Sequence, residues 1–178
     1  MLASWLLIAA PAPAAECLRK LRGIDLQTAT IPDLQAAMAA GRITSEELTE
    51  AYLARIAAYD TAGPALNSVR QLHHRAREQA ATADAERRAG RVRGPLHGIP
   101  VLLKDNVATD DLPTTAGSIA LEGVVPKRDA TITQRLRAAG AVILGKANLS
   151  EFANWVALGM PNGYSSLGGQ VRNAHDLG

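Results

Sequence analysis

The chain has 178 residues, enough for one ordinary domain with a sizeable core. Hydrophobic residues at 47% and charged residues at 20% are typical of a folded globular protein and exclude an intrinsically disordered one. Basic and acidic residues nearly balance at +2, and the few aromatic residues offer no stacking platform for bases, so we expect no nucleic-acid partner. The single cysteine, Cys17, excludes an internal disulfide bond and a cysteine zinc cluster.

The first residues are typical of an export signal. An apolar stretch from Leu2 to Ala10 precedes Ala12-Pro13-Ala14, whose small residues suit a signal peptidase. We therefore predict a signal peptide over residues 1–15 and a periplasmic or secreted protein, with a cytoplasmic location as the alternative if the signal is not used. This segment is too short to span a bilayer and no later stretch is long enough, so no membrane partner is expected.

Local signals predict the first elements of the domain. Residues 16–29 are expected to be an irregular lead-in to a domain over residues 30–178. Thr30-Ile31-Pro32-Asp33 then opens a helix, with proline in the first turn and Gly41 just past the helix end. Thr44 and Glu47 have the spacing of a capping box, which predicts the start of a second helix.

Helices and short apolar strands then alternate along the chain. The predicted segments are an extended piece at 66–72, a helix ending near Ala89, a strand at 99–103, a helix capped by Asp129 and closed by Gly140, a strand at 141–144 and a short helix at 149–155. Fully apolar strands between helices predict an α/β fold with a mixed, mostly parallel sheet covered by helices on both faces. Because only two strands are convincing and the chain ends in a Gly- and Asn-rich segment, we expect an incomplete, amino-terminal part of such a fold.

Lys104 stands out because it follows the apolar strand Ile99–Leu103 at once. A protonated amine in a dry interior is costly, so such a lysine either reaches water or has a chemical role, and the solvated strand end is the more common case.

Gly140–Lys146 matches the first seven positions of a phosphate loop, but its four central residues are expected to form a buried strand and Ala147 replaces the required hydroxyl residue. The adjacent His73 and His74 cannot face one metal, so neither a metal nor a cofactor is expected.

Four segments occur in a fixed order: GIPVLLKDN, PTTAGSIAL, DATITQRLRAAGAVILGKANLSEFA and SSLGGQVRN. This ordered set resembles the amidase signature family of serine amide hydrolases, most closely the bacterial stand-alone amidases and peptide amidases. The resemblance covers residues 30–178 and is densest from Gly94 onward. It implies a small-molecule or peptide amide substrate, no cofactor, and an undetermined oligomeric state.

The resemblance assigns roles to individual residues. It makes Lys104 the terminal base of a Ser–cis-Ser–Lys triad, in which a neutral amine takes the proton of a serine nucleophile. It also places Ala153 at the acyl pocket, with Gly117 and Ser118 on a nearby substrate-binding loop. By contrast, Lys146 is expected at the end of a structural strand, where arginine would be tolerated.

The resemblance also implies that both triad serines lie in a Gly- and Ser-rich loop and a later segment that this chain does not contain. The chain alone is therefore expected to be inactive. Two further interpretations stay open. One is an amidotransferase A-type subunit that supplies ammonia with the same triad, and the other is a non-catalytic truncated product.

Overall fold

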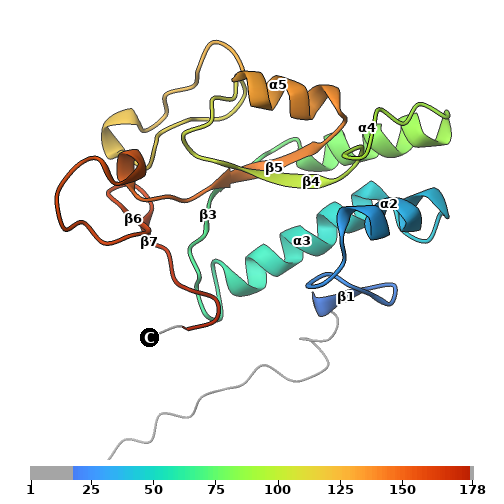
Figure 1. The fold of residues 1–178 in the computed structure, drawn as a ribbon, viewed down its shortest axis with the longest axis horizontal. Coiled ribbons are helices and arrows are strands. Elements are labelled where there is room, and N and C mark those ends of the chain that lie inside the picture. The colour runs from blue at the N-terminus through green and yellow to red at the C-terminus, as the bar shows by residue number, and fades with distance from the viewer. Residues whose placement is uncertain (1–17, 177–178) are drawn as a thin grey trace, which may run out of the picture.

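The computed structural model describes residues 18–176, so the predicted signal peptide lies outside the described residues (Figure 1). Strands β1 (Lys20–Leu21) and β2 (Ile24–Asp25) pair antiparallel at the start of this range. The predicted irregular lead-in is thus partly a small hairpin. It is followed by the buried side chain of Leu26, which joins the core beneath the first two long helices.

Both predicted helix starts are confirmed. Helix α2 (Ile31–Ala39) begins after Thr30, whose hydroxyl accepts a hydrogen bond from the Asp33 amide while the Asp33 carboxylate accepts one from the Thr30 amide. Helix α3 (Ser45–Tyr59) begins with the same reciprocal pair between Thr44 and Glu47. Each box satisfies amides that the first helical turn leaves without backbone partners.

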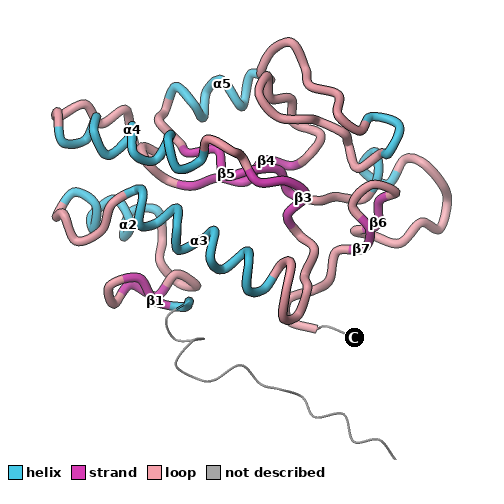
Figure 2. The backbone as a smooth tube through the Cα atoms, turned by 180° about the vertical axis from the view of Figure 1, so that it is seen from behind, coloured by secondary structure: helices cyan, strands magenta, loops and turns pink. Residues whose placement is uncertain are grey.

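The sheet has three strands in the order β3-β5-β4. They are β3 (Val69–Leu72), β4 (Pro100–Lys104) and β5 (Val142–Ala147), with β4 parallel and β3 antiparallel to the central β5. The α/β class with a mixed sheet is therefore confirmed, and the extended piece expected near residue 70 is the third strand. Figure 2 shows β4 and β5 running side by side between layers of helices.

Helices lie on both sides of the sheet. In both backbone views α2 and α3 are on one side of β4 and β5, and α5 (Thr131–Ala138) is on the other (Figures 1 and 2). Helix α4 (Ala76–Arg88) packs against α3 and β5 through buried alanines, whose small side chains allow close approach. Its cluster with β5 contains Ala76, Ala80, Val142 and Leu144.

The predicted cap of α5 is wrong. The N-cap residue is Ala130, which makes no side-chain capping hydrogen bond. Asp129 lies one residue earlier, and its carboxylate instead accepts hydrogen bonds from the Asp110 amide and from the Arg137 guanidinium. The predicted end is confirmed, since the helix closes at Ala138 and Gly140 follows with a φ of +79°.

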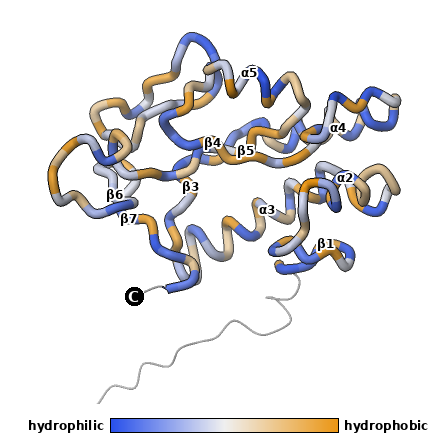
Figure 3. The backbone as a smooth tube through the Cα atoms, viewed as in Figure 1, coloured by the Kyte–Doolittle hydropathy of each residue, from blue (hydrophilic) through white to orange (hydrophobic). Residues whose placement is uncertain are grey.

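The segments after the sheet are irregular. Short 3₁₀ turns η1 (Ile119–Leu121) and η2 (Glu151–Asn154) and the hairpin of β6 (Tyr164–Ser165) with β7 (Gly169–Gln170) are their regular parts. The helix predicted over 149–155 is reduced to η2, because Phe152 and Ala153 adopt left-handed backbone conformations. Figure 3 colours parts of the loop after η2 as hydrophobic, and Trp155 within it is 89% exposed.

Candidate active site

Lys104 occupies the last position of β4 and is exposed. In the parallel pair, Lys104 lies opposite Ala147, and Leu103 lies opposite Lys146. Because successive side chains of a strand point to opposite faces, Lys104 and Lys146 project from opposite faces of the sheet. The face that carries Lys104 also carries Leu102, which is 38% exposed, so the prediction of a strand buried throughout is wrong for this face.

A cavity of about 380 Å³ opens beside Lys104. Its walls come from the last residue of β4 and from segments that follow β5, at the edge where open α/β sheets bind ligands. The structure brings the predicted base Lys104 and the predicted pocket residue Ala153 to this one cavity. The lining residues are Lys104, Asn148, Leu149, Ser150, Ala153, Asn154, Asn162, Gly163 and Val171.

Asn148 fixes the shape of the cavity wall. Its side-chain amide donates hydrogen bonds to the carbonyl oxygens of Asn67 and Gly168, at 3.0 and 3.1 Å. Its side-chain oxygen accepts a hydrogen bond from the Leu149 amide at 2.9 Å. One residue just past β5 thereby joins the start of β3 to the hairpin loop. No sequence pattern marks Asn148 as a site residue, although it lies within the motif that carries the resemblance.

Gly117 and Ser118 do not line this cavity. Gly117 has a φ of +77° and lies against Ser165, leaving no room for a side chain. The Ser118 side chain is buried and hydrogen-bonded to Glu151, and that contact, after the larger effect of the Ser166 hydrogen bonds, helps to lower the pKa of Glu151. Gly117 therefore lies against the β6–β7 hairpin, whereas Ser118 ties the same loop to η2. The substrate-binding role of both residues stays a prediction.

Lys146 is confirmed as a strand residue, but it is fully buried. Its amine donates hydrogen bonds to the Val107 carbonyl oxygen at 2.6 Å and to the Thr114 hydroxyl at 2.8 Å. Burial lowers the pKa of Lys146, and the negative charge of Asp105 opposes that shift. A buried, tightly surrounded amine has no space for a larger guanidinium, which argues against the expected tolerance of arginine.

Asp105 is a second buried residue that the sequence prediction does not include. Its carboxylate is fully buried and accepts hydrogen bonds from the Thr115 hydroxyl and the Thr115 amide. The Lys146 amine lies 4.0 Å from the same carboxylate. The sequence signal for Asp105 is its position directly after a strand-end lysine. That position alone does not distinguish a buried aspartate from a solvated one.

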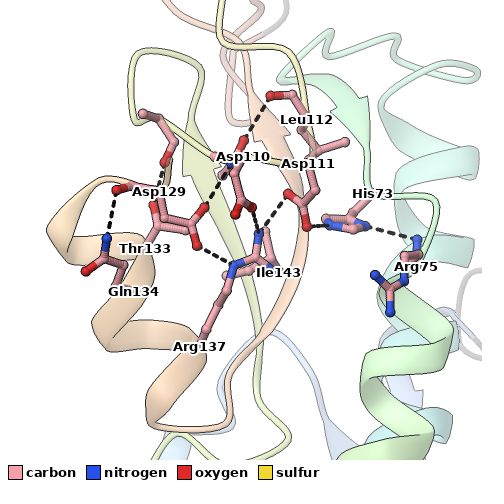
Figure 4. A network of polar contacts seen from close by, with 12 residues as sticks. His73, Arg75, Asp110, Asp111, Leu112, Asp129, Thr133, Gln134, Arg137 and Ile143 are labelled. Atoms are coloured by element: carbon pink, nitrogen blue, oxygen red, sulfur yellow. Dashed lines mark hydrogen bonds and ion pairs between the residues drawn. The ribbon is translucent and has the colours of Figure 1, made fainter. Parts of the chain in front are cut away.

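A second polar network holds the loop between β4 and α5 (Figure 4). The His73 ring contacts Asp111 at 2.9 Å, Arg137 donates to Asp111 at 2.7 Å, and Arg137 also pairs with Asp129 at 2.9 Å. Burial chiefly lowers the pKa of His73, against the opposing effect of Asp111. Burial alone would raise the pKa of Asp111, but its hydrogen bonds and charge contacts with His73 and Arg137 bring it below its usual value.

Among residues 18–176, no three His, Cys, Asp or Glu side chains come together as metal ligands. Within the same range, no helix is both long and apolar enough to cross a membrane. The cavity beside Lys104 is a candidate site on its own geometry, because it lies at the edge where open α/β sheets bind ligands.

The mixed α/β sheet in this arrangement matches the corresponding part of solved amidase structures. The structure is similar to native peptide amidase from Stenotrophomonas maltophilia, with a TM-score of 0.83 and 52% identity over 84% of this chain and 31% of that one. It is also similar to an amidase family protein from Bacillus anthracis, with a TM-score of 0.78 and 41% identity over 86% of this chain and 32% of that one.

Residues 47–178 match the amidase family, and the chain belongs to that family. A glutamyl-tRNA(Gln) amidotransferase subunit of Chloroflexus aurantiacus is 49% identical over 130 residues, which are 72% of this chain and 26% of that protein. The chain thus spans about a third or less of the length of these relatives.

Proposed function

We propose that this chain supplies the lysine base of an amide hydrolase that cleaves a carboxamide C–N bond through a serine acyl-enzyme. The observation that carries the proposal is the state of Lys104. Lys104 lines an open cavity at the carboxyl edge of the sheet, and within residues 18–176 its amine makes no hydrogen bond or ion pair. Lys146, the other lysine on these strands, has both hydrogen bonds and a charge partner.

In the proposed reaction, the neutral Lys104 amine accepts the proton of the serine nucleophile through a bridging serine. The serine oxygen then bonds to the substrate carbonyl carbon. When the C–N bond breaks, the ammonium returns the proton to the leaving nitrogen, and water later releases the acid from the acyl-enzyme by the same relay. Both serines come from outside residues 18–176 in this proposal, so the 178-residue chain alone hydrolyses no amide.

The proposed substrate is a small-molecule or peptide amide. Similarity to a protein named as a peptide amidase supports the peptide end of this range. The second candidate function is ammonia supply by an amidotransferase A-type subunit, favoured by the 49% identity over 130 residues to an amidotransferase component. The third, a non-catalytic product, is the outcome if no expressed form of the protein turns over an amide.

The test uses the complete open reading frame that encodes this chain. Lys104→Ala lowers turnover of a simple carboxamide by about 10²–10⁴-fold, the usual loss for a positioned general base. Lys104→Arg does not restore turnover, because a guanidinium stays protonated and cannot accept the proton. The exposed Lys127→Ala is the matched control and keeps normal turnover.

Near-normal turnover by the Lys104→Arg variant would overturn the base assignment. The two enzymatic candidates separate in the same assay. A hydrolase releases ammonia or an amine from the carboxamide without added proteins, whereas an amidotransferase component needs an acceptor and its partner proteins.

A further inference from the structure

Lys104 begins a tight turn that buried groups hold in place. The Val107 amide donates a hydrogen bond to the Lys104 carbonyl oxygen at 2.9 Å, which closes the turn. The Val107 carbonyl oxygen in turn accepts the hydrogen bond from the buried Lys146 amine at 2.6 Å. The buried lysine of β5 is therefore one hydrogen bond away from the turn that follows the exposed lysine of β4.

Asp105 ties the same turn to the next loop. Its own amide donates to the Ala147 carbonyl oxygen at 3.1 Å, and its carbonyl oxygen accepts from the Ala116 amide at 2.9 Å. Its carboxylate holds Thr115 through two hydrogen bonds. The Thr115 hydroxyl also accepts a hydrogen bond from the Gly117 amide at 3.1 Å. The peptide unit after Lys104 is thus held on the strand side and on the loop side.

Neither charge in this cluster reaches solvent. Lys146 and Asp105 side chains are both 0% exposed, with the amine and the carboxylate oxygen 4.0 Å apart. Breaking a buried pair by removing one partner leaves an uncompensated charge, which is strongly unfavourable. The surroundings must then rearrange, and the segments in direct contact with the pair are the turn at residues 105–107 and the loop at 114–117.

From these contacts we propose that Asp105 and Lys146 are positioning residues that direct the Lys104 amine into the cavity. The proposal rests on the proposed function of Lys104 as base. A lysine side chain is long and flexible, so the location of its amine depends first on the direction of its Cα–Cβ bond, which the strand-end backbone sets. A misplacement of about 1 Å at a reacting group can cost on the order of 10²-fold in rate.

The first arm of the test measures amide hydrogen exchange in the 178-residue chain. Asp105→Asn and Lys146→Met should each raise the exchange rate of the Val107 and Ala116 amides by about tenfold or more, the effect of losing one charge-assisted hydrogen bond. Thr115→Val is the milder second variant, because it removes only the hydroxyl that bonds Asp105 and nearly conserves the shape. Lys127→Met, an exposed lysine changed in the same way, is the control and leaves both amides unchanged.

The second arm measures kinetics in the protein from the complete open reading frame. Each positioning variant that remains folded should lower kcat by about tenfold or more with KM changed by less than about twofold, since ground-state binding does not use the amine. The Asp105→Asn/Lys146→Met double variant should lose less than the product of the two single losses, because the two residues act as one unit.

The two proposals fail in different ways. If Lys104→Ala keeps full turnover, the proposed function falls, while the exchange arm still reports whether Asp105 and Lys146 hold the turn. Unchanged exchange at Val107 and Ala116 in Thr115→Val and in both charge variants would overturn the positioning role whatever the turnover. A loss confined to KM, or losses that multiply in the double variant, would overturn it as well.

Discussion

Lys104 and Lys146 lie one register position apart on neighbouring parallel strands, yet one is exposed and the other has no exposed side-chain surface. The difference comes from the faces that they occupy. Lys146 meets the carbonyl oxygen of Val107 and the hydroxyl of Thr114, which compensate for its lost hydration. Two residues of the same type therefore have opposite relationships to water within a single strand pair.

The buried Lys146 should make the stability of the chain depend on pH in the alkaline range. Because burial lowers the pKa of Lys146, the native state releases this proton at a lower pH than the unfolded chain, which holds it up to about 10.5. Between these values the unfolded state binds more protons, so the free energy of unfolding contributed by Lys146 rises with pH. Urea unfolding at pH 8, 9 and 10 should show the free energy of unfolding of wild type rising relative to that of Lys146→Met. The same pH dependence of the free energy of unfolding in both proteins would contradict this expectation.

The His73 network should weaken on the acid side. The His73 Nδ1 atom accepts a hydrogen bond from the Arg75 amide, so the ring proton is on Nε2 and points to Asp111. Burial lowers the pKa of His73 below its usual 6.5, so the unfolded chain binds this proton first as the pH falls. The free energy of unfolding should therefore decrease as the pH drops below 6.5.

His73→Gln, which keeps a donor toward Asp111, should flatten this acid-side loss between pH 6.5 and the range where carboxylates titrate. The neighbouring His74 is exposed and supplies the matched control, since His74→Gln should keep the wild-type slope. Equal slopes for His73→Gln and wild type, measured by urea unfolding, would show that another group causes the dependence.

Arg137 should matter more than another arginine on the same helix. It bridges Asp111 and Asp129, at 2.7 and 2.9 Å, and its side chain is 27% exposed. Arg137→Met should lower the free energy of unfolding by about 2 kcal/mol, the loss expected for hydrogen bonds to charged groups. Arg135 on α5 is exposed, and Arg135→Met should stay within about 0.5 kcal/mol of wild type. Equal losses in urea unfolding would argue against the bridge.

Two glycines with the same backbone conformation separate strain from crowding. Gly117 has a φ of +77° and a Cβ there would lie 2.8 Å from the Ser165 Cβ, whereas Gly123 has a φ of +76° and open space around it. Both substitutions by alanine carry about 1–2 kcal/mol of left-handed strain. Gly117→Ala should cost at least about 1 kcal/mol more, because it also overpacks a buried contact. Thermal unfolding of the two variants provides the comparison.

The parts of the fold that could be predicted are those specified by neighbouring residues. Thr30 with Asp33 and Thr44 with Glu47 are reciprocal pairs three residues apart, and both appear in the structure as the sequence pattern indicates. Strand β3 is harder to predict, because Val-Arg-Gln-Leu is half polar and its antiparallel partner comes more than 70 residues later. The end of β4 could be located from hydrophobicity to within one residue, since the predicted strand ends at Leu103 and β4 ends at Lys104.

The parts of the site that could not be predicted depend on distant partners. Asp129 looked like a helix cap, but Arg137 and the Asp110 amide use its carboxylate. The burial of Lys146 depends on Val107 and Thr114, which precede it by 39 and 32 residues. No local pattern distinguishes such a lysine from a solvated one. The resemblance therefore names Lys104 as the predicted base but does not name Asp105 and Lys146, whose contacts reach the turn after it.

The strand order has a consequence for the timing of synthesis. Strands β3 and β4 are made first but do not pair with each other, and both use β5 as their hydrogen-bonded neighbour. At about 5–20 residues per second, β5 leaves the ribosome on the order of 4–15 seconds after β3. During that interval β3 and β4 have open edges that other chains can pair with. A nascent chain stalled before residue 142 is therefore the form of this protein for which a chaperone matters most.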